Sequence, residues 1–390
     1  MNRVMVMTSR VPWPLEKGDK LRMYHQLRAM RGKVHVSLCC LSHKPVSEAD
    51  RQALLEVCDE LHIIRLNRIL MGLNLLRALF SDRPYQVHYF FQRRARKQVY
   101  AIASAYKPDH IYCQLIRAAE YVKHIHVCHK TLDYMDALGK GMERRASSAS
   151  GLRKRFIEAE RKRLGNYENL VFDYFEHHTI ISDQDRGFIL HPQNKDIQVV
   201  PNGVDTDYFK PDPHSKDVDV LFLGNMNYPP NVDGACYLVE ELLPLLREQR
   251  PDIRIMLAGA NPHRRVKALE QPGVTVTGWM DDVREAYLRS KVFVAPMRLG
   301  TGLQNKLLEA LSMELPCTTT SLAFRPLAPG AAAVVTEANT SEAIAHAVLE
   351  QISAAEVDPK TGAAGRTFVQ EHYSWAGRVA PLLEQFNTTA

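Results

Sequence analysis

Residues 292–313 have the sequence VFVAPMRLGTGLQNKLLEALSM, which joins a short apolar run to a segment of helical period. The apolar run VFVAPM (292–297) predicts a buried strand, and LQNKLLEALSM (303–313) predicts the helix that follows it. The glycine-rich turn RLGTG (298–302) connects the two. A strand, a tight turn and a helix in this order are the repeating unit of an α/β sheet.

The same alternation extends over the whole chain. Apolar runs lie at 3–8, 34–41, 61–66, 110–115, 130–134, 178–182 and 197–202, and again at 219–225, 253–259, 274–279, 292–297, 317–321 and 332–335. Apolar strands that alternate with helices predict parallel sheets covered on both faces. Since the pattern occurs twice, we expect two doubly wound, Rossmann-like α/β domains, with the Pro-rich segment 208–217 as a linker and a ligand in the cleft between them.

The length of 390 residues suits two domains. We expect an N-terminal domain over 1–205, a C-terminal domain over 206–367, and an amphipathic helix in 368–390 that crosses back to the N-terminal domain. Two less regular stretches are the mainly helical 66–100 and the Ala-, Ser- and Arg-rich 136–165, which we interpret as a loop that leads into a helix.

Composition excludes several classes of protein. With 45% hydrophobic and 24% charged residues the chain is ordinary for a globular protein, and no apolar run reaches the ~20 residues that span a bilayer. The N-terminus lacks the features of a secretory signal. None of the seven cysteines has a spacing suited to zinc. We therefore expect a cytoplasmic chain with buried, reduced thiols.

Charge is distributed unevenly. Residues 1–205 contain 33 Lys and Arg against 22 Asp and Glu, a balance of +11, whereas 206–390 contain 17 against 22, a balance of −5. The basic stretches 93–97, 153–155 and 161–163 form either a solvated helical face or a surface for anionic lipid at the inner face of the membrane. No nucleic-acid motif accompanies the charge, so we expect no nucleic-acid partner.

Several common kinds of catalytic site are excluded. The chain has no G-x-G-x-x-G after a strand, no Walker A sequence, no G-x-S-x-G and no H-E-x-x-H. Dinucleotide-dependent enzymes, P-loop enzymes, serine hydrolases and zinc proteases are therefore not indicated. We expect no cofactor and no metal.

The turn at 298–302 has the properties of an anion site. Glycines there let the backbone approach a phosphate, and we expect free N–H groups from Gly302 and Leu303 at the start of the helix. Lys306 and Glu309 share one helical face, so the lysine could neutralise a phosphate while the carboxylate accepts hydroxyl hydrogen bonds from a ribose. The alternative is a glycine-rich turn with a surface Lys–Glu pair at helical spacing.

These motifs together resemble a known family. VVPNGVDTDYFKP (199–211), GWMDDVREAYLRSKVFVAPM (278–297) and GTGLQNKLLEAL (300–311) are similar to the family 4 retaining glycosyltransferases of the GT-B fold. SRVPWPLEKGDKLRMYHQL (9–27), which contains Gly18, and MNYPPNVDG (226–234) are similar to the exosortase-associated sugar transferases of bacterial exopolysaccharide loci.

The resemblance implies metal-independent transfer of a sugar, with retention, from a nucleotide diphosphate sugar to a glycan or lipid-linked acceptor. The residues that it implies for the donor are Arg298 and Lys306 on the diphosphate, Glu309 on the ribose, Trp279 and Met280 near the base, Gly18 from across the cleft, and Gly224, Asn225, Gly300, Thr301, Gly302 and Leu303 around the sugar and phosphates.

The sequence departs from the family pattern at two places. Many members carry two glutamates eight residues apart. Glu309 corresponds to the later one, but this chain has Thr301 in place of the earlier one, so backbone groups from Gly300 to Leu303 would take over the contacts to the sugar. Members also often carry Arg and Lys in and after the Gly224 loop, where this chain has Asn225, Met226, Asn227 and Pro229. Diphosphate binding would then depend more on Arg298 and Lys306.

The N-terminal domain is expected to hold the acceptor. Asp133 and Asp136 follow a predicted strand, where either carboxylate could orient the acceptor or receive its proton; the alternative is a helix N-cap. Two other functions stay open. One is a sugar-nucleotide epimerase on the same fold, and the other is an inactive, two-lobed nucleotide-sugar-binding protein.

Overall fold

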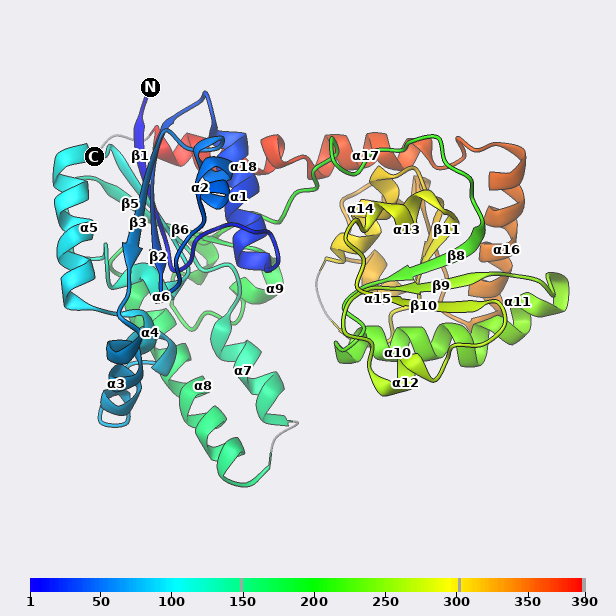
Figure 1. Cartoon of the computed structure of the whole chain (residues 1–390), viewed down its shortest axis with the longest axis horizontal. Helices are drawn as coiled ribbons and strands as arrows, with labels where there is room; N and C mark the ends of the chain where they lie inside the picture. Colours follow the sequence, from blue (N-terminus) through cyan, green and yellow to red (C-terminus); the bar gives the residue numbers. More distant parts are fainter. Residues whose placement is uncertain (148–149, 301–302, 388–390) are drawn as a thin grey trace. The chain divides into compact units, whose positions relative to one another are not determined.

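The computed structural model describes the whole chain apart from residues 148–149, 301–302 and 388–390. It divides into two compact units (Figure 1). Unit 1 comprises Met1–Asn202 and the chain from Trp375 onward, and unit 2 comprises Gly203–Ser374. The division lies at 202/203, where the sequence predicts 205/206. The expected linker is not the connection, because Phe209 within it packs against the core of unit 2.

Unit 1 contains a parallel sheet of seven strands in the order β3-β2-β1-β4-β5-β6-β7. The strands are β1 (Arg3–Thr8), β2 (His35–Ser42), β3 (Glu60–Arg65), β4 (His110–Gln114), β5 (His129–Asp133), β6 (His177–Ile180) and β7 (Gln198–Val199). The strand order reverses between β1 and β4, which is the position where doubly wound sheets bind ligands.

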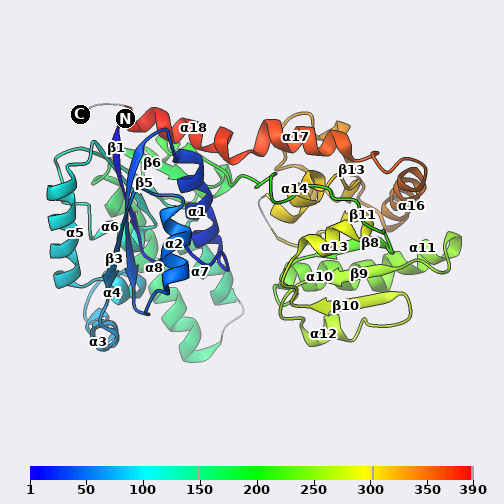
Figure 2. The same ribbon diagram turned by 45° about the horizontal axis from the view of Figure 1, so that its top comes forward.

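Helices cover both faces of this sheet (Figure 2). They are α1 (Gly18–Met30), α2 (Glu48–Leu55), α3 (Arg68–Ala78), α4 (Tyr85–Phe90), α5 (Arg93–Tyr106), α6 (Ile116–Ala119), α7 (Leu138–Ser147), α8 (Gly151–Phe172), α9 (Asp183–Arg186), the short η1 (Asn194–Asp196) and α18 (Trp375–Phe386). Alternate residues of β1 enter different cores: Val4 and Val6 pack with α1 and α18, whereas Met5 and Met7 pack with α5 and α8. This alternation requires apolar side chains on both sides of the strand.

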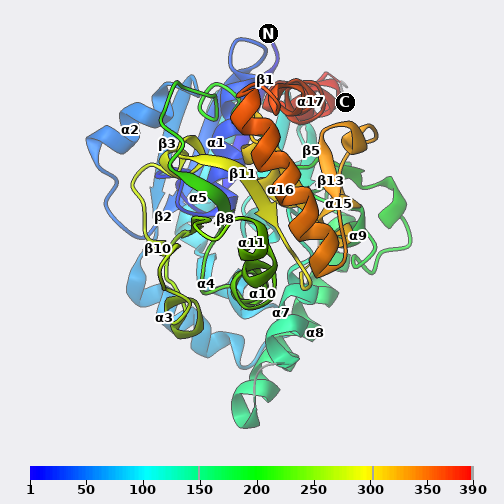
Figure 3. The ribbon, with the colours of Figure 1, turned by 90° about the vertical axis from the view of Figure 1, so that its right-hand side faces the viewer.

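Unit 2 contains a parallel sheet of six strands in the order β10-β9-β8-β11-β12-β13. The strands are β8 (Val218–Leu223), β9 (Ile255–Ala258), β10 (Val274–Gly278), β11 (Ser290–Ala295), β12 (Cys317–Thr319) and β13 (Val335–Glu337). The helices are α10 (Pro229–Tyr237), η2 (Leu238–Leu242), α11 (Leu243–Gln249), α12 (Arg264–Lys267), α13 (Arg284–Leu288), α14 (Asn305–Ser312), α15 (Ser321–Phe324), η3 (Ala331–Ala333), α16 (Ser341–Val357) and α17 (Ala363–Tyr373). Figure 3 shows α16 crossing one face of the sheet.

Two sequence expectations about helices were wrong in part. The stretch 136–165 leads into a helix, α8, as expected, but the part before it is not a loop, since α7 occupies most of it and packs against α8. The single helix expected over 368–386 is two helices, α17 and α18, separated by the extended Ser374. Trp375 then stacks on His25 with ring centroids 5.3 Å apart, which attaches α18 to α1 of unit 1. All seven cysteines are free and buried, as expected.

Two buried histidines predict acid sensitivity in unit 1. Burial, together with the nearby His177 and His129, lowers the pKa of His110 to about 3, and burial lowers the pKa of His178 to about 4. Because both stay neutral in the folded state, stability is full above the ordinary pKa of ~6.5 and falls as the pH drops toward these values. Between pH 7 and pH 5 we expect each histidine to lower the free energy of unfolding of unit 1 by about 2 kcal/mol.

Urea unfolding at the two pH values measures this loss. His110→Gln, whose side chain does not titrate, should reduce the pH dependence by about half of the expected total. An unchanged pH dependence in that variant would show that His110 is not one of the responsible groups.

Candidate functional site

The carboxyl ends of β8 and β9 lie unusually close to each other. Gly259 has a φ of +134°, and a Cβ on it would lie 1.8 Å from the carbonyl oxygen of Gly224. A Cβ on Gly224 would in turn lie 2.5 Å from Nδ2 of Asn231, at the start of α10. Both positions therefore require glycine, and the space that they leave admits the Asn231 side chain.

Asn231 holds the amino group of Lys306. The Lys306 Nζ donates to Asn231 Oδ1 over 2.8 Å, and the Asn231 amide donates to the Asn225 carbonyl over 3.0 Å. Nζ also lies 3.4 Å from the sulfur of Met297 and 4.2 Å from the centroid of the Phe222 ring. The lysine is thus positioned by neutral groups from three separate elements.

Burial dominates the electrostatics of Lys306. Only 8% of the residue is exposed, and this burial lowers the pKa of Lys306 to about 7, although Glu309 acts to raise it. The residue also stands in the first turn of α14, where the helix dipole disfavours a cation. A buried amino group with so little compensation would be stabilised by an anion, as a phosphate site requires.

Glu309 lies one turn after Lys306 on the same helix, so the expectation that the pair is on one face is correct. The Tyr287 hydroxyl, 2.9 Å from Glu309 Oε2 and 3.2 Å from the Lys306 carbonyl oxygen, is positioned to donate to either. Burial raises the pKa of Glu309, against the hydrogen bond from Tyr287 and the charge of Lys306. The pair is therefore not the solvated surface pair of the alternative interpretation.

Arg298 makes contacts that the sequence does not predict. Its guanidinium pairs with Asp233 of α10 at 3.1 Å and with Glu241 of η2 at 2.7 Å, and it lies over the Tyr237 ring. The side chain is 41% exposed. To contact a diphosphate, Arg298 would have to leave both carboxylates, so its role in donor binding stays a prediction.

The glycine-rich turn is described only in part. Gly300 has a φ of +111°, and a Cβ there would lie 3.4 Å from Pro230 at the start of α10. Thr301 and Gly302 lie outside the described residues. Leu303 packs against the core, and α14 begins at Asn305 after Gln304 as N-cap. The expectation that Leu303 belongs to the first helical turn was therefore wrong.

The remaining donor candidates of unit 2 follow other strands. Trp279 comes directly after β10, is 72% exposed, and donates from Nε1 to Asp281 over 3.0 Å. Met280 packs against the core instead. Asn225, after β8, is exposed, and its side chain accepts from the backbone N–H of Asn227. Contacts of these residues with a base or a sugar stay predictions.

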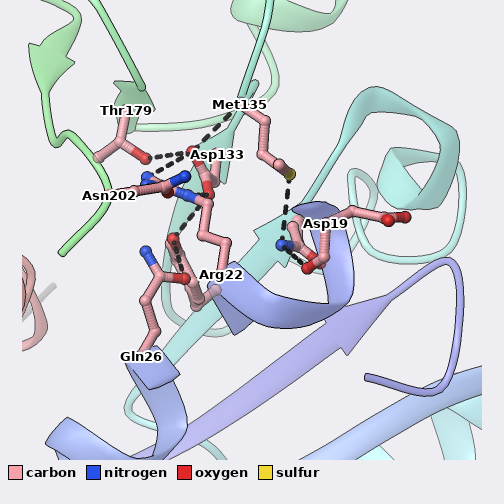
Figure 4. A network of polar contacts seen from close by, with 9 residues as sticks. Asp19, Arg22, Gln26, Asp133, Met135, Thr179 and Asn202 are labelled. Atoms are coloured by element: carbon pink, nitrogen blue, oxygen red, sulfur yellow. Dashed lines mark hydrogen bonds and ion pairs between the residues drawn. The ribbon is translucent and has the colours of Figure 1, made fainter. Parts of the chain in front are cut away.

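Asp133 lies within a network of polar contacts (Figure 4). It is fully buried and forms an ion pair of 2.8 Å with Arg22 of α1, which is also fully buried. The Tyr112 and Thr179 hydroxyls and the Met135 backbone N–H also donate to it. The structure fits neither sequence interpretation, because Asp133 caps no helix and has no exposed surface from which to orient an acceptor. It stabilises the carboxyl edge of the sheet of unit 1.

Arg22 extends this buried network beyond Asp133. The Nη1 of Arg22 donates to Oδ1 of Asn202 over 3.0 Å. Asn202 is the last residue of the first segment of unit 1. Asp136 is exposed and lies two residues before the start of α7 at Leu138. Met135 between the two aspartates has a φ of +60°. Of the two candidates only Asp136 is exposed, and its contact with an acceptor stays a prediction.

A cavity of about 380 Å³ lies at the carboxyl ends of β1 and β2 in unit 1. The loop before Gly18, the first residue of α1, forms one wall of it. Arg10, Trp13, Lys17, Lys20, His43 and Lys44 are among its lining residues. Burial, then the charge of Lys44, lowers the pKa of His43, so this imidazole is neutral at pH 7 and could accept a hydrogen bond from a hydroxyl.

Known proteins share parts of this architecture. Residues 217–354 match the family model of the glycosyl transferases group 1. An uncharacterized 44.6 kDa protein of the cps region of Klebsiella pneumoniae is 23% identical over 345 residues, which are 83% of this chain and 84% of that protein.

Solved structures resemble the whole chain. A glycosyltransferase from Rickettsia africae has a TM-score of 0.66 at 14% identity, over 99% of this chain and 98% of its own. Sucrose-phosphate synthase from Thermosynechococcus elongatus has a TM-score of 0.64 at 14% identity, over 98% of both chains. HepE from Anabaena in complex with UDP has a TM-score of 0.63 at 13% identity, over 99% of both chains. The fold is GT-B. The family-model match lies within unit 2, and the likeness to the solved structures shows the fold.

Two residues of this GT-B chain were missed by sequence reasoning. Asn231 and Tyr287 position Lys306 and Glu309, yet they lie 75 and 22 residues from their partners along the chain. The only local signal for Asn231 is its place directly after Pro229 and Pro230, where a helix starts. Within the described part of the chain, no group of three or more His, Cys, Asp and Glu side chains could hold a metal ion.

Proposed function

We propose that this chain is a retaining, metal-independent glycosyltransferase of family 4. It would transfer a sugar from a nucleotide diphosphate sugar to the hydroxyl of a glycan or lipid-linked acceptor. The observation that carries the proposal is the buried Lys306, held by Asn231 one turn before Glu309, inside the stretch 217–354 that matches the family model. The stability lost by burying an amino group in this way favours a functional role.

The chemistry assigned to the site is limited to charge and position. The bond between the anomeric carbon and the phosphate oxygen breaks while the acceptor oxygen bonds to the same face of the sugar. The acceptor proton passes to the leaving phosphate oxygen. Lys306 stabilises the charge that develops on the diphosphate, and Glu309 accepts hydrogen bonds from the ribose hydroxyls.

The acceptor is proposed to bind in the 380 Å³ cavity of unit 1, which is lined by Lys17, Lys20 and Lys44. Exopolysaccharide synthesis is the proposed setting, supported by the relative from the cps region; the exosortase-associated subtype rests on the resemblance of the sequence motifs. We also propose a cytoplasmic location at the inner face of the membrane. Among the described residues, no helix is long and apolar enough to cross a bilayer.

Uridine nucleotides are the first donors to test, because HepE has been solved with UDP-glucose and TarM of S. aureus with UDP. In calorimetric titrations with EDTA present, we expect UDP to bind as tightly as with Mg²⁺. We expect the affinity to fall by up to tenfold per unit between pH 7 and pH 9, because the pKa of free Lys306 is about 7 and its charged form binds the diphosphate.

GDP and ADP serve as comparisons, and Lys306→Met should remove the dependence on pH. Binding that requires Mg²⁺ would contradict metal independence, and a Kd independent of pH would contradict the contact between Lys306 and the diphosphate. Nucleotide binding without transfer would favour the inactive binding protein, and interconversion of the sugar would favour the epimerase.

A further inference from the structure

Helix α3 exposes an apolar face that has no counterpart elsewhere in the described residues. Seven of the nineteen large apolar side chains exposed in the described part of the chain lie between Ile69 and Phe80. Ile69 is 75% exposed, Leu76 60% and Phe80 92%. Scattered apolar residues are normal on protein surfaces, but a contiguous group of this kind marks an interaction site.

The burial pattern of α3 shows that this face is not required for packing inside unit 1. The helix already contacts the core through Met71, Asn74 and Ala78, which are buried on one side. The side chains of Ile69, Leu73 and Leu76 follow a helical spacing on the other side, and the exposed Phe80 follows in the turn after the helix. A solvent-facing helix would normally carry polar residues there, so the outer face is adapted to an apolar environment.

Arginines surround this face. Between Arg65 and Lys97 the chain has eight basic residues and a single acidic one, Asp82. A cavity of about 510 Å³ between α3, α4 and the start of α5 is lined by Arg77, Arg83, Arg93 and Arg94 together with Leu70. Arginine is the side chain best suited to bind phosphate, because its planar fork donates two parallel hydrogen bonds.

Helix α8 lies beside this surface. The ring of Phe156 of α8 packs against that of Tyr85 of α4 with centroids 4.7 Å apart, and Arg163 donates to the carbonyl of Ala78 at the end of α3. Arg153, Lys154 and Arg155 are exposed on the same helix. In Figures 1 and 3, α3 and the α7–α8 pair extend from the same end of unit 1. Apolar and basic side chains are thus gathered at one end of this unit.

We infer that this end of unit 1 docks on an anionic lipid membrane. The outer face of α3 enters the interfacial layer, and the arginine-lined cavity receives a lipid headgroup phosphate. This inference rests on the membrane association proposed above and gives it a location, but it does not depend on sugar transfer. It would place unit 1 where a lipid-linked acceptor is found.

Other occupants fit the surface less well. A two-fold contact between copies of this chain would bring the arginines of both copies together, where equal charges repel. Nucleic acid would use the arginines but has no contact for exposed leucines, because single strands are bound by stacking on aromatic rings. A bilayer satisfies both features, since acyl chains take up the apolar side chains and anionic headgroups attract the arginines.

Sedimentation with vesicles tests the inference on the full chain. One variant, Ile69→Ser/Leu76→Ser/Phe80→Ser, removes the apolar face. A second, Arg93→Gln/Arg94→Gln, removes two charges beside it. The matched controls are Val127→Ser, which is 75% exposed elsewhere in unit 1, and Lys33→Gln/Lys195→Gln, which removes the same charge at exposed positions.

We expect the wild type to bind phosphatidylglycerol-containing vesicles at least tenfold more tightly than phosphatidylcholine vesicles. Each patch variant should weaken binding at least tenfold, and the controls less than twofold. UDP binding, measured without lipid, should be the same in all of them, so a failed donor site and a failed membrane site are distinguishable. No vesicle binding by the wild type at low salt, equal losses in the controls, or a lipid-free dimer that the triple variant dissociates would each overturn the inference.

Discussion

Replacing Lys306 with Met is expected to lower kcat/KM at least a hundredfold while the melting temperature stays the same or rises. Removing a group that stabilises charge in the transition state typically costs about 3 kcal/mol or more. Methionine matches the apolar surroundings of Phe222 and Met297, and it removes a charge whose burial lowers the pKa of Lys306 to about 7. Because the variant no longer buries this charge, it gains stability that offsets the free-energy cost of leaving Asn231 Oδ1 without its donor.

Steady-state kinetics and thermal unfolding of the same preparation measure both effects. Lys267→Met is the matched control, because it makes the same change at an exposed lysine of unit 2. A variant that keeps its activity would remove Lys306 from the site. A variant that loses stability along with activity would show that the lysine is structural.

Replacing Arg22 with Met is expected to destabilise unit 1 by about 3–5 kcal/mol, because it leaves the Asp133 carboxylate buried without its cation. The double variant Arg22→Met/Asp133→Asn removes both charges, so it should be destabilised by less than the sum of the two single changes. Urea unfolding of the three variants gives the coupling between the two residues. Arg28→Met, at an exposed position of the same helix, is the control.

The same experiment decides the role of Asp133. If this carboxylate only stabilises the sheet edge, Asp133→Asn loses activity in proportion to the folded fraction. A variant as stable as the wild type but inactive would restore the view that Asp133 acts on the acceptor. In that case the buried network would have to open during the reaction.

Much of the fold was predictable, because a strand covered on both faces must be apolar along its length. Each of the thirteen apolar runs in the sequence overlaps a strand of the two sheets. Likewise, Lys306 and Glu309 share a face because residues three apart on a helix always do. These predictions needed only the local period of the chain.

Other parts of the site depend on residues that are distant in the sequence. Asp133 follows a strand as a ligand-binding carboxylate would, and only the arrival of Arg22 from α1 shows that it is buried. The position of Arg298 between Asp233 and Glu241 depends on how α10 and η2 pack beside the turn. Local periodicity contains no information about such partners.

By itself the sequence determined the two parallel sheets, the helix that carries Lys306 and Glu309, and the excess of positive charge before residue 205, since these follow from local pattern and composition. Only the tertiary structure decided that Lys306 is buried against Asn231, that Asp133 is paired with Arg22, and that α3 turns an apolar face outward. The reason is physical: burial and pairing are set by long-range packing, which brings together side chains whose separation in the chain leaves no mark on its period.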